Sequence, residues 1–97
     1  MLISKEKEEA LFKKIAIRDK EAKDVIISSN LFLVESVSKK YVENEKGLSL
    51  SELKELGLIG LKKAVEKYDP ASTYKFSTYS IWWIRNEIHK ALGINDK

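Results

Sequence analysis

Apolar residues recur at three- and four-residue steps along most of the chain, which is the spacing of an amphipathic α-helix. In the first half this pattern predicts helices over about 5–17 and 20–28, and a third that follows residue 30. Ser4 and Asn30 are candidate N-caps, and Asp19 starts the second helix. The side chains that we expect to face inward are Leu11, Phe12, Ile15, Ala22, Val25, Ile26, Leu31, Val34, Val37 and Tyr41.

A fourth helix is predicted over about 50–68. The polar residues 43–48 before it surround Gly47 and indicate a loop, and Ser49 and Glu52 have the spacing of a capping box. Its inward arc consists of Leu53, Leu56, Gly57, Gly60, Leu61, Ala64 and Tyr68. Each glycine costs a helix about 1 kcal/mol relative to alanine. Close packing of a neighbouring helix explains their presence best.

A last helix follows a break at Asp69 and Pro70 and a connection over 71–76. Ser77 or Thr78 caps its start, and it runs to about residue 92, where Gly93 occupies the position after the end. Strand-type alternation is absent, so the sequence predicts an all-α protein, a compact bundle of about four to five helices. We expect one domain over 1–97, with N-terminal helices over about 1–29 and the main core over 30–97.

Composition excludes several classes of protein. With 43% hydrophobic and 34% charged residues the chain is globular, and without cysteine it has neither a disulfide nor a thiolate metal site. No apolar run approaches the roughly 18 residues of a membrane span, and the N-terminus does not resemble a signal peptide, so we expect a cytoplasmic protein. One histidine and no glycine-rich phosphate loop argue against an enzyme, and no cofactor or metal is expected.

The last predicted helix has two different faces. Six of the nine aromatic residues of the chain lie between positions 68 and 83. On a helical wheel, one side gathers Ile81, Ile84, Ile88, Ala91 and Leu92. The opposite side gathers Tyr79, Trp82, Asn86 and His89, flanked by Trp83, Arg85 and Lys90. The helix therefore has an aliphatic face and an aromatic face that also carries basic and hydrogen-bonding groups.

Two interpretations of this second face remain open. In the first, the helix lies centrally in the bundle and packs on both sides. In the second, the rings are a platform on which nucleobases stack while Arg and Lys hold the phosphates. The net charge of +3, from 18 basic and 15 acidic residues, is low for a protein that binds duplex DNA alone. A nucleic-acid function would then need stacking or a larger partner.

Several segments resemble region two of bacterial sigma factors. Residues 74–85 read YKFSTYSIWWIR, close to the family pattern YKFSTYATWWIR. Upstream, residues 30–34 read NLFLV, 57–61 read GLIGL and 67–70 read KYDP, similar to NLRLV, GNIGL and KFDP of the family. The likeness covers roughly 19–92, and the paired tryptophans resemble the primary and heat-shock classes. It implies the helical fold of that region.

The resemblance also implies two partners, promoter DNA and core RNA polymerase, with an anti-sigma factor as a further candidate. In the family, this module recognises the −10 promoter element and traps its non-template strand as single-stranded DNA. Tyr79 would take the place of a flipped adenine, and Trp82 and Trp83 would wedge at the upstream fork. The positions implied to bind DNA are Tyr74, Lys75, Phe76, Thr78, Tyr79, Trp82, Trp83, Arg85, Asn86, His89 and Lys90.

Docking on a coiled coil of the largest polymerase subunit is implied for the outer face of the fourth helix. The positions are Glu52, Glu55, Leu56, Leu58, Ile59 and Lys62. The chain departs from the family there, because Leu56 and Leu58 replace polar residues. In the last helix, Glu87 stands where the family often has a small residue.

Two alternative functions also stay open. The same fold could serve as a protein-interaction module that binds polymerase or a regulator and touches no promoter. A helix-turn-helix that binds duplex DNA is the second alternative. It fits less well, because about eight residues separate the last two helices, against the usual turn of about 3–4.

Overall fold

The computed structural model describes residues 3–16 and 19–94, and the side chains of 15 and 16 lie outside the described part. The described helices are α1 (Lys5–Ala16), α2 (Lys20–Ser29), α3 (Leu31–Ser38), the 3-10 turn η1 (Lys39–Tyr41), α4 (Leu50–Lys67) and α5 (Phe76–Leu92). Every regular element in the described ranges is helical, which confirms the all-α prediction. The expected inward position of Ile15 and the end of the first helix at residue 17 lie outside the described residues.

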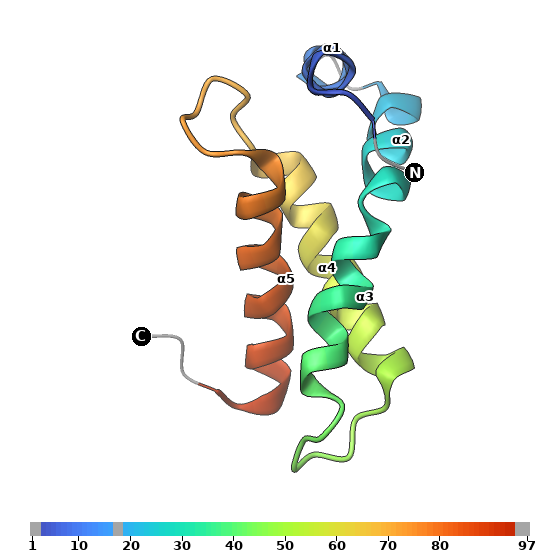
Figure 1. Cartoon of the computed structure of the whole chain (residues 1–97), viewed down its shortest axis with the longest axis vertical. Coiled ribbons are helices and arrows are strands. Elements are labelled where there is room, and N and C mark those ends of the chain that lie inside the picture. The colour runs from blue at the N-terminus through green and yellow to red at the C-terminus, as the bar shows by residue number, and fades with distance from the viewer. Residues whose placement is uncertain (1–2, 17–18, 95–97) are drawn as a thin grey trace.

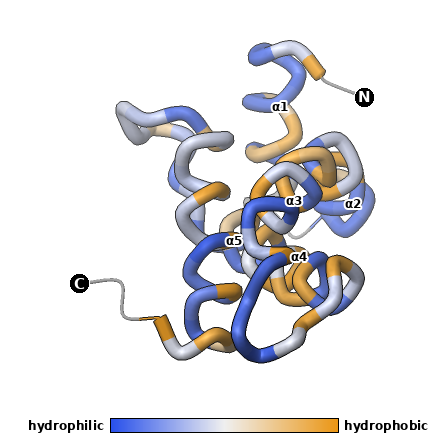
Figure 2. Tube along the Cα trace, turned by 60° about the horizontal axis from the view of Figure 1, so that its bottom comes forward, coloured by the Kyte–Doolittle hydropathy of each residue, from blue (hydrophilic) through white to orange (hydrophobic). Residues whose placement is uncertain are grey.

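Helix α4 holds the bundle together, because it packs against α5, α3 and α2. In Figure 1, α3, α4 and α5 run side by side, while α1 crosses at one end near the connection between α4 and α5. Leu53 and Leu61 of α4, and Ile84 and Ile88 of α5, are completely buried. Hydrophobic positions gather where α3 and α4 meet, and the connection between them is mostly hydrophilic (Figure 2).

The two glycines of α4 permit close packing, as predicted. A Cβ atom at Gly60 would lie 2.5 Å from the carbonyl oxygen of Trp83 and 2.7 Å from the Cα atom of Ile84. At Gly57 the nearest atom would be a methyl carbon of Val34, at 2.9 Å. The backbones of α4 and α5 therefore touch at Gly60, which fixes how the last helix lies on the bundle.

Most predicted helix ends are confirmed. The side chains of Ser4 and Asp19 accept hydrogen bonds from backbone N–H groups three residues on, at 3.1 Å each. Ser49 and Glu52 form a reciprocal capping box with two bonds of 3.1 Å. Gly93 closes α5 in the left-handed conformation, with φ of 74°. These contacts satisfy backbone groups that a helix end leaves without partners.

Asn30 occupies the predicted N-cap position of α3 without a capping hydrogen bond, and the predicted caps of α5 are wrong. The Asn30 side chain does not cap α3, because its amide donates to the Ile26 carbonyl oxygen at 2.7 Å and so closes α2. Helix α5 begins at Phe76, and neither Ser77 nor Thr78 caps it. Phe76 is 1% exposed, and burying such a ring is worth about 1.5–3 kcal/mol, more than the roughly 1 kcal/mol of a cap. The core therefore decides where this helix starts.

Three inward assignments are also wrong. Val25, Leu31 and Ala91 were expected to face the core, but all three are exposed. A helical wheel assigns a face from one helix alone, whereas burial depends on which neighbouring helices cover each position. The exposed Leu31 lies next to the exposed Phe32 on α3.

Candidate nucleic-acid interface

Seven aromatic rings from α1, α5 and the connection between α4 and α5 form one continuous series. Each ring centroid lies 5.0–6.2 Å from at least one neighbour. The members of this ring series are Phe12, Phe76, Tyr68, Tyr74, Tyr79, Trp83 and Trp82. Spacings of this size are typical of favourable aromatic pairs, so the rings hold one another in place.

The ring series changes from buried to exposed along its length. Phe12 and Phe76 are buried in the core, while Tyr74 is 46% and Trp82 is 55% exposed. Tyr74 and Tyr79 are stacked, with centroids 5.4 Å apart and planes at 26°. Trp82 stands perpendicular to Trp83 at 5.2 Å. The inner rings therefore support outer rings that present surface to solvent.

Hydrogen bonds shape the connection between α4 and α5. The Tyr68 hydroxyl donates to the Tyr74 carbonyl oxygen at 2.8 Å, and the Ser72 hydroxyl donates to the same oxygen at 3.3 Å. Asp69 accepts from the backbone N–H of Ala71 at 2.9 Å. These bonds fix the backbone that carries Tyr74, so its ring is positioned before any ligand arrives.

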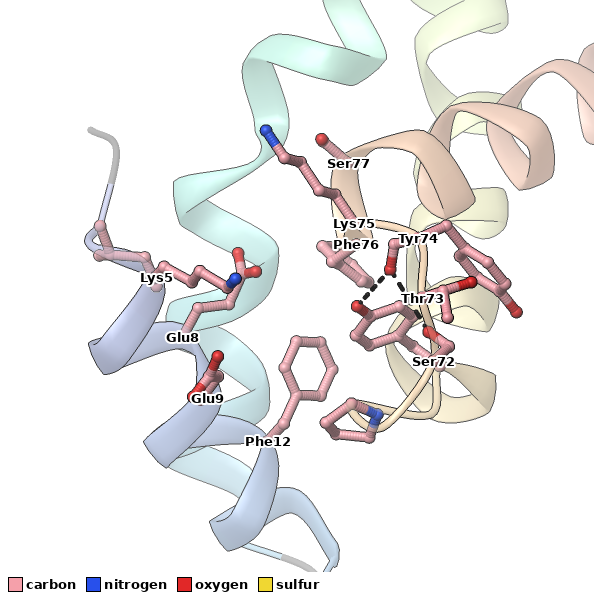
Figure 3. Close-up of a pocket in the computed structure, with 13 residues that line it drawn as sticks. Lys5, Glu8, Glu9, Phe12, Ser72, Thr73, Tyr74, Lys75, Phe76 and Ser77 are labelled. Carbon is pink, nitrogen blue, oxygen red and sulfur yellow. Dashed lines mark hydrogen bonds between the residues drawn. The ribbon is translucent and has the colours of Figure 1, made fainter.

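A pocket of about 340 Å³ lies between α1 and this connection (Figure 3). One wall carries Lys5, Glu8 and Glu9 of α1, and the other carries Tyr74 and Lys75. Burial raises the pKa of the Glu8 carboxyl, and the neighbouring Glu9 adds to the effect. The two carboxyl groups thus lie across an open space from the connection, while the Tyr74 ring points away from α1 (Figure 3).

Basic groups accompany the exposed rings. The Lys67 ammonium lies 6.0 Å from the centre of the Trp83 ring, and Lys75 and Arg85 are exposed. The Lys90 ammonium is paired with Glu87 at 3.3 Å. Lys67 was not among the predicted DNA-binding residues. Its position became clear only with the packing of α4 on α5, which no feature of either helix alone reveals.

Two of the predicted DNA-binding side chains are buried. Phe76 is a buried inner member of the ring series, and His89 is 8% exposed. The Tyr41 hydroxyl and the His89 Nε2 atom share a hydrogen bond of 2.6 Å. The expectation that both side chains meet DNA directly needs correction, because neither presents a free surface here. Tyr41 of η1 packs on His89 and so covers a part of α5 that the helical wheel predicted to be free.

The other predicted positions are accessible to different degrees. Thr78 is exposed, whereas Tyr79, Trp83 and Asn86 are half-buried. Within the half-buried Trp83, the indole nitrogen is buried and has no hydrogen-bond partner. The structure therefore brings together the rings of α5 and the connection, with Thr78 and Asn86 at their margins.

The predicted polymerase-binding positions form the outer face of α4. Glu52, Glu55, Ile59 and Lys62 are exposed, and Leu56 and Leu58 are half-buried. Beside them, a pocket of about 530 Å³ opens between α3 and α4. We call it the α3–α4 groove, and its lining includes Leu31, Phe32, Glu35, Lys54, Glu55 and Leu58. Leu31 and Phe32 were not predicted as binding residues, although exposed apolar pairs of this kind often mark contact sites.

Comparison with known proteins identifies the family. The model of sigma-70 region 2 matches residues 26–96. The chain belongs to the sigma-70 region 2 family. RNA polymerase sigma factor SigA of Synechocystis sp. is 45% identical over 84 residues, which are 87% of this chain and 19% of that protein. SigA of Listeria monocytogenes is 44% identical over 92 residues, 95% of this chain and 24% of that protein.

Membership confirms the resemblance that the motifs indicated, namely region two of a primary-type sigma factor. This sigma region 2 chain spans about a fifth to a quarter of the length of these relatives. Its described residues contain no group of three or more acidic or histidine side chains that could hold a metal ion. None of the described helices is long and apolar enough to cross a membrane.

Proposed function

We propose that this sigma region 2 chain docks on core RNA polymerase and captures the non-template strand of the promoter −10 element on its exposed rings. The observation that carries the proposal is the ring series, whose members include the stacked pair of Tyr74 and Tyr79 and the exposed Trp82. The Lys67 ammonium lies over Trp83, and Lys75 and Arg85 are exposed in the same segment of the chain. Flat rings next to cations suit unpaired bases on a phosphate backbone. Promoter binding requires access to the chromosome, so the proposal includes a cytoplasmic location.

Capture of the open strand can drive melting without catalysis. Extruding a base costs a few kcal/mol, and A·T-rich steps unstack most readily. Stacking on a protein ring returns about 1–3 kcal/mol per base. A few bases held on preformed rings therefore offset the cost of opening a short segment, so the protein acts as a binding factor and needs no cofactor.

The residues take different parts in this proposal. Tyr79 replaces the flipped adenine, and Trp82 and Trp83 sit at the upstream fork of the bubble. Tyr74 and Thr78 line the path of the strand. The groups that meet phosphates are Lys75 and Arg85, with Lys67 added from its place over Trp83, whereas the predicted contact Lys90 is paired with Glu87.

The remaining predicted residues act at the edge of the site or beneath it. Asn86 is the accessible side chain for the upstream base pair, because His89 is held by Tyr41. Phe76 and His89 support the rings and the helix from beneath.

Polymerase docking occupies a different surface in the proposal. Glu52, Glu55, Ile59 and Lys62 lie on the outer face of α4, and Leu56 and Leu58 border it. The α3–α4 groove continues this face with the exposed side chains of Leu31 and Phe32. Apolar side chains of the coiled coil in the largest subunit would bind in this groove. An anti-sigma factor would compete for the same face.

The test compares strand binding by the parent chain and by Trp82→Ala, with Val42→Ala as control. Trp82 and Val42 are both exposed apolar residues, so both variants should fold. A labelled single strand with a TATAAT-like sequence should lose about tenfold in affinity with Trp82→Ala, which corresponds to about 1.4 kcal/mol of stacking. The control should bind like the parent. Equal affinity of all three proteins, or a preference for duplex, would contradict the proposal.

A further inference from the structure

Glu87 is a charged residue with an unexpected environment. It is 8% exposed and lies between Ile84 and Ile88, which are completely buried, on the side of α5 that packs on α4. One of its oxygens accepts hydrogen bonds from two ammonium groups, Lys63 of α4 at 2.9 Å and Lys90 of α5 at 3.3 Å. A buried carboxylate needs such partners, because leaving water is unfavourable for a charge.

The carboxylate stays ionised at neutral pH. Burial acts to raise the pKa of Glu87, but the hydrogen bonds and positive charges of Lys63 and Lys90 outweigh it and hold that pKa below its ordinary value. A single negative charge therefore sits between two positive charges. Each lysine keeps part of its surface in solvent, with 40% of the Lys63 side chain and 61% of the Lys90 side chain exposed.

These two lysines lie next to the proposed path of the strand. Trp83, Glu87 and Lys90 follow one another along one stripe of α5, at steps of four and three residues. On α4, Lys63 stands one turn before Lys67, whose ammonium lies over the Trp83 ring. A strand that reaches Trp83 therefore passes close to both ammonium groups while Glu87 neutralises part of their charge.

We propose that Glu87 is an electrostatic brake on DNA binding, which holds Lys63 and Lys90 on its carboxylate and keeps them from the phosphates of the captured strand. This rests on the proposed function and adds a residue that sets its strength. Because of this brake, the free protein binds the strand weakly. Strong strand binding then requires that the protein is assembled with a partner. Phosphates would compete with the carboxylate for the same two ammonium groups.

The test replaces Glu87 with the isosteric, uncharged glutamine and measures single-strand affinity across salt concentrations. Each lysine that gains a phosphate should steepen the plot of log affinity against log salt by about 0.7 and raise affinity about fivefold near 0.1 M salt. Glu66→Gln is the matched control, since Glu66 pairs with Lys23 at 2.9 Å and faces α2 instead of the rings. It changes net charge equally but should leave the salt slope unchanged.

A double-mutant cycle distinguishes a Glu87 that weakens DNA binding from a Glu87 that positions Lys90 for DNA binding. Lys90→Gln should change strand affinity less than twofold in the parent, but about fivefold in the Glu87→Gln background. Weaker binding by Glu87→Gln, or an equal effect of Lys90→Gln in both backgrounds, would overturn the brake and make Glu87 a residue that positions Lys90. If Glu87→Gln does not fold, Lys63→Gln with Lys90→Gln in the parent replaces it, and a slope change near 1.4 overturns the brake.

The outcomes also separate this inference from the proposed function. Binding by the parent with an unchanged salt slope in Glu87→Gln refutes the brake alone. Binding by Glu87→Gln when the parent does not bind supports the brake in its strongest form. Absence of strand binding in both proteins refutes the brake and the proposed function together.

Discussion

At the scale of single residues, Gly60 is the position where this fold tolerates least change. Its missing side chain lets the backbone of α5 approach, and an added methyl group would meet backbone atoms of Trp83 and Ile84. Backbone cannot rotate out of the way as a side chain can. The two helices would have to separate, and the rings of α5 would move with them.

Gly60→Ala should therefore destabilise the protein by about 3 kcal/mol, near the upper end of the usual range for overpacking. Gly57→Ala is the matched comparison, because its Cβ would meet side-chain methyl groups of Val34 and Ile84, which can shift. We expect that change to cost about 1 kcal/mol. Urea unfolding followed by circular dichroism gives both values. An equal cost for the two variants would contradict the contact at Gly60.

The charge of Glu87 should also appear in the pH dependence of stability. Because its pKa is lowered in the folded protein, the unfolded state binds more protons as pH falls, and the stabilisation present at neutral pH is lost below about pH 4.5. At pH 7 the free energy of unfolding of the parent should exceed that of Glu87→Gln by roughly 1 kcal/mol or less, because the two lysines are partly exposed to solvent. Urea titrations should show this difference disappearing toward pH 3. A constant difference would refute the ionised pair.

At the scale of elements, the helices follow from the sequence and their contacts do not. The capping box of α4 and the glycine that ends α5 have local signals, so both were predicted correctly. Asn30 lies at the predicted N-cap position of α3, but its side chain donates to α2, four residues back. His89 lies on the aromatic side of the wheel, yet Tyr41, 48 positions away along the chain, buries it. A contact between distant segments decides the burial of His89, and a helical period carries no information about it.

The capping box of α4 gives a prediction for a whole element. Ser49→Ala removes the side-chain acceptor for the Glu52 backbone N–H, which should cost about 1 kcal/mol. Ser51→Ala, one residue inside the same helix and exposed, should change stability by less than about 0.5 kcal/mol. Thermal unfolding of the two variants provides the measurement. If Ser49→Ala is as stable as Ser51→Ala, the cap does not stabilise α4.

At the scale of the molecule, the two proposed binding surfaces share no residue. The ring series belongs to α1, α5 and the connection between α4 and α5. The α3–α4 groove instead lies between α3 and the first half of α4, next to the end of α2. The sequence located six of the seven rings because they lie close together, at positions 68–83, whereas Phe12 joins them only through the packing of α1. The groove combines residues 28–35 with 51–58, so only the packing of α3 on α4 shows it.

This separation predicts that each partner can be lost without the other. Phe32→Ala removes an exposed ring from the groove and should weaken binding to core RNA polymerase roughly thirtyfold, or about 2 kcal/mol, with strand affinity unchanged. Trp82→Ala should do the reverse. The measurement is the affinity of each of the two variants for purified core enzyme and for the labelled strand, compared with the parent. Loss of both activities in Phe32→Ala, with its helix content intact, would show that the surfaces are coupled. Unchanged polymerase binding would remove the groove from the docking surface and leave the outer face of α4 alone.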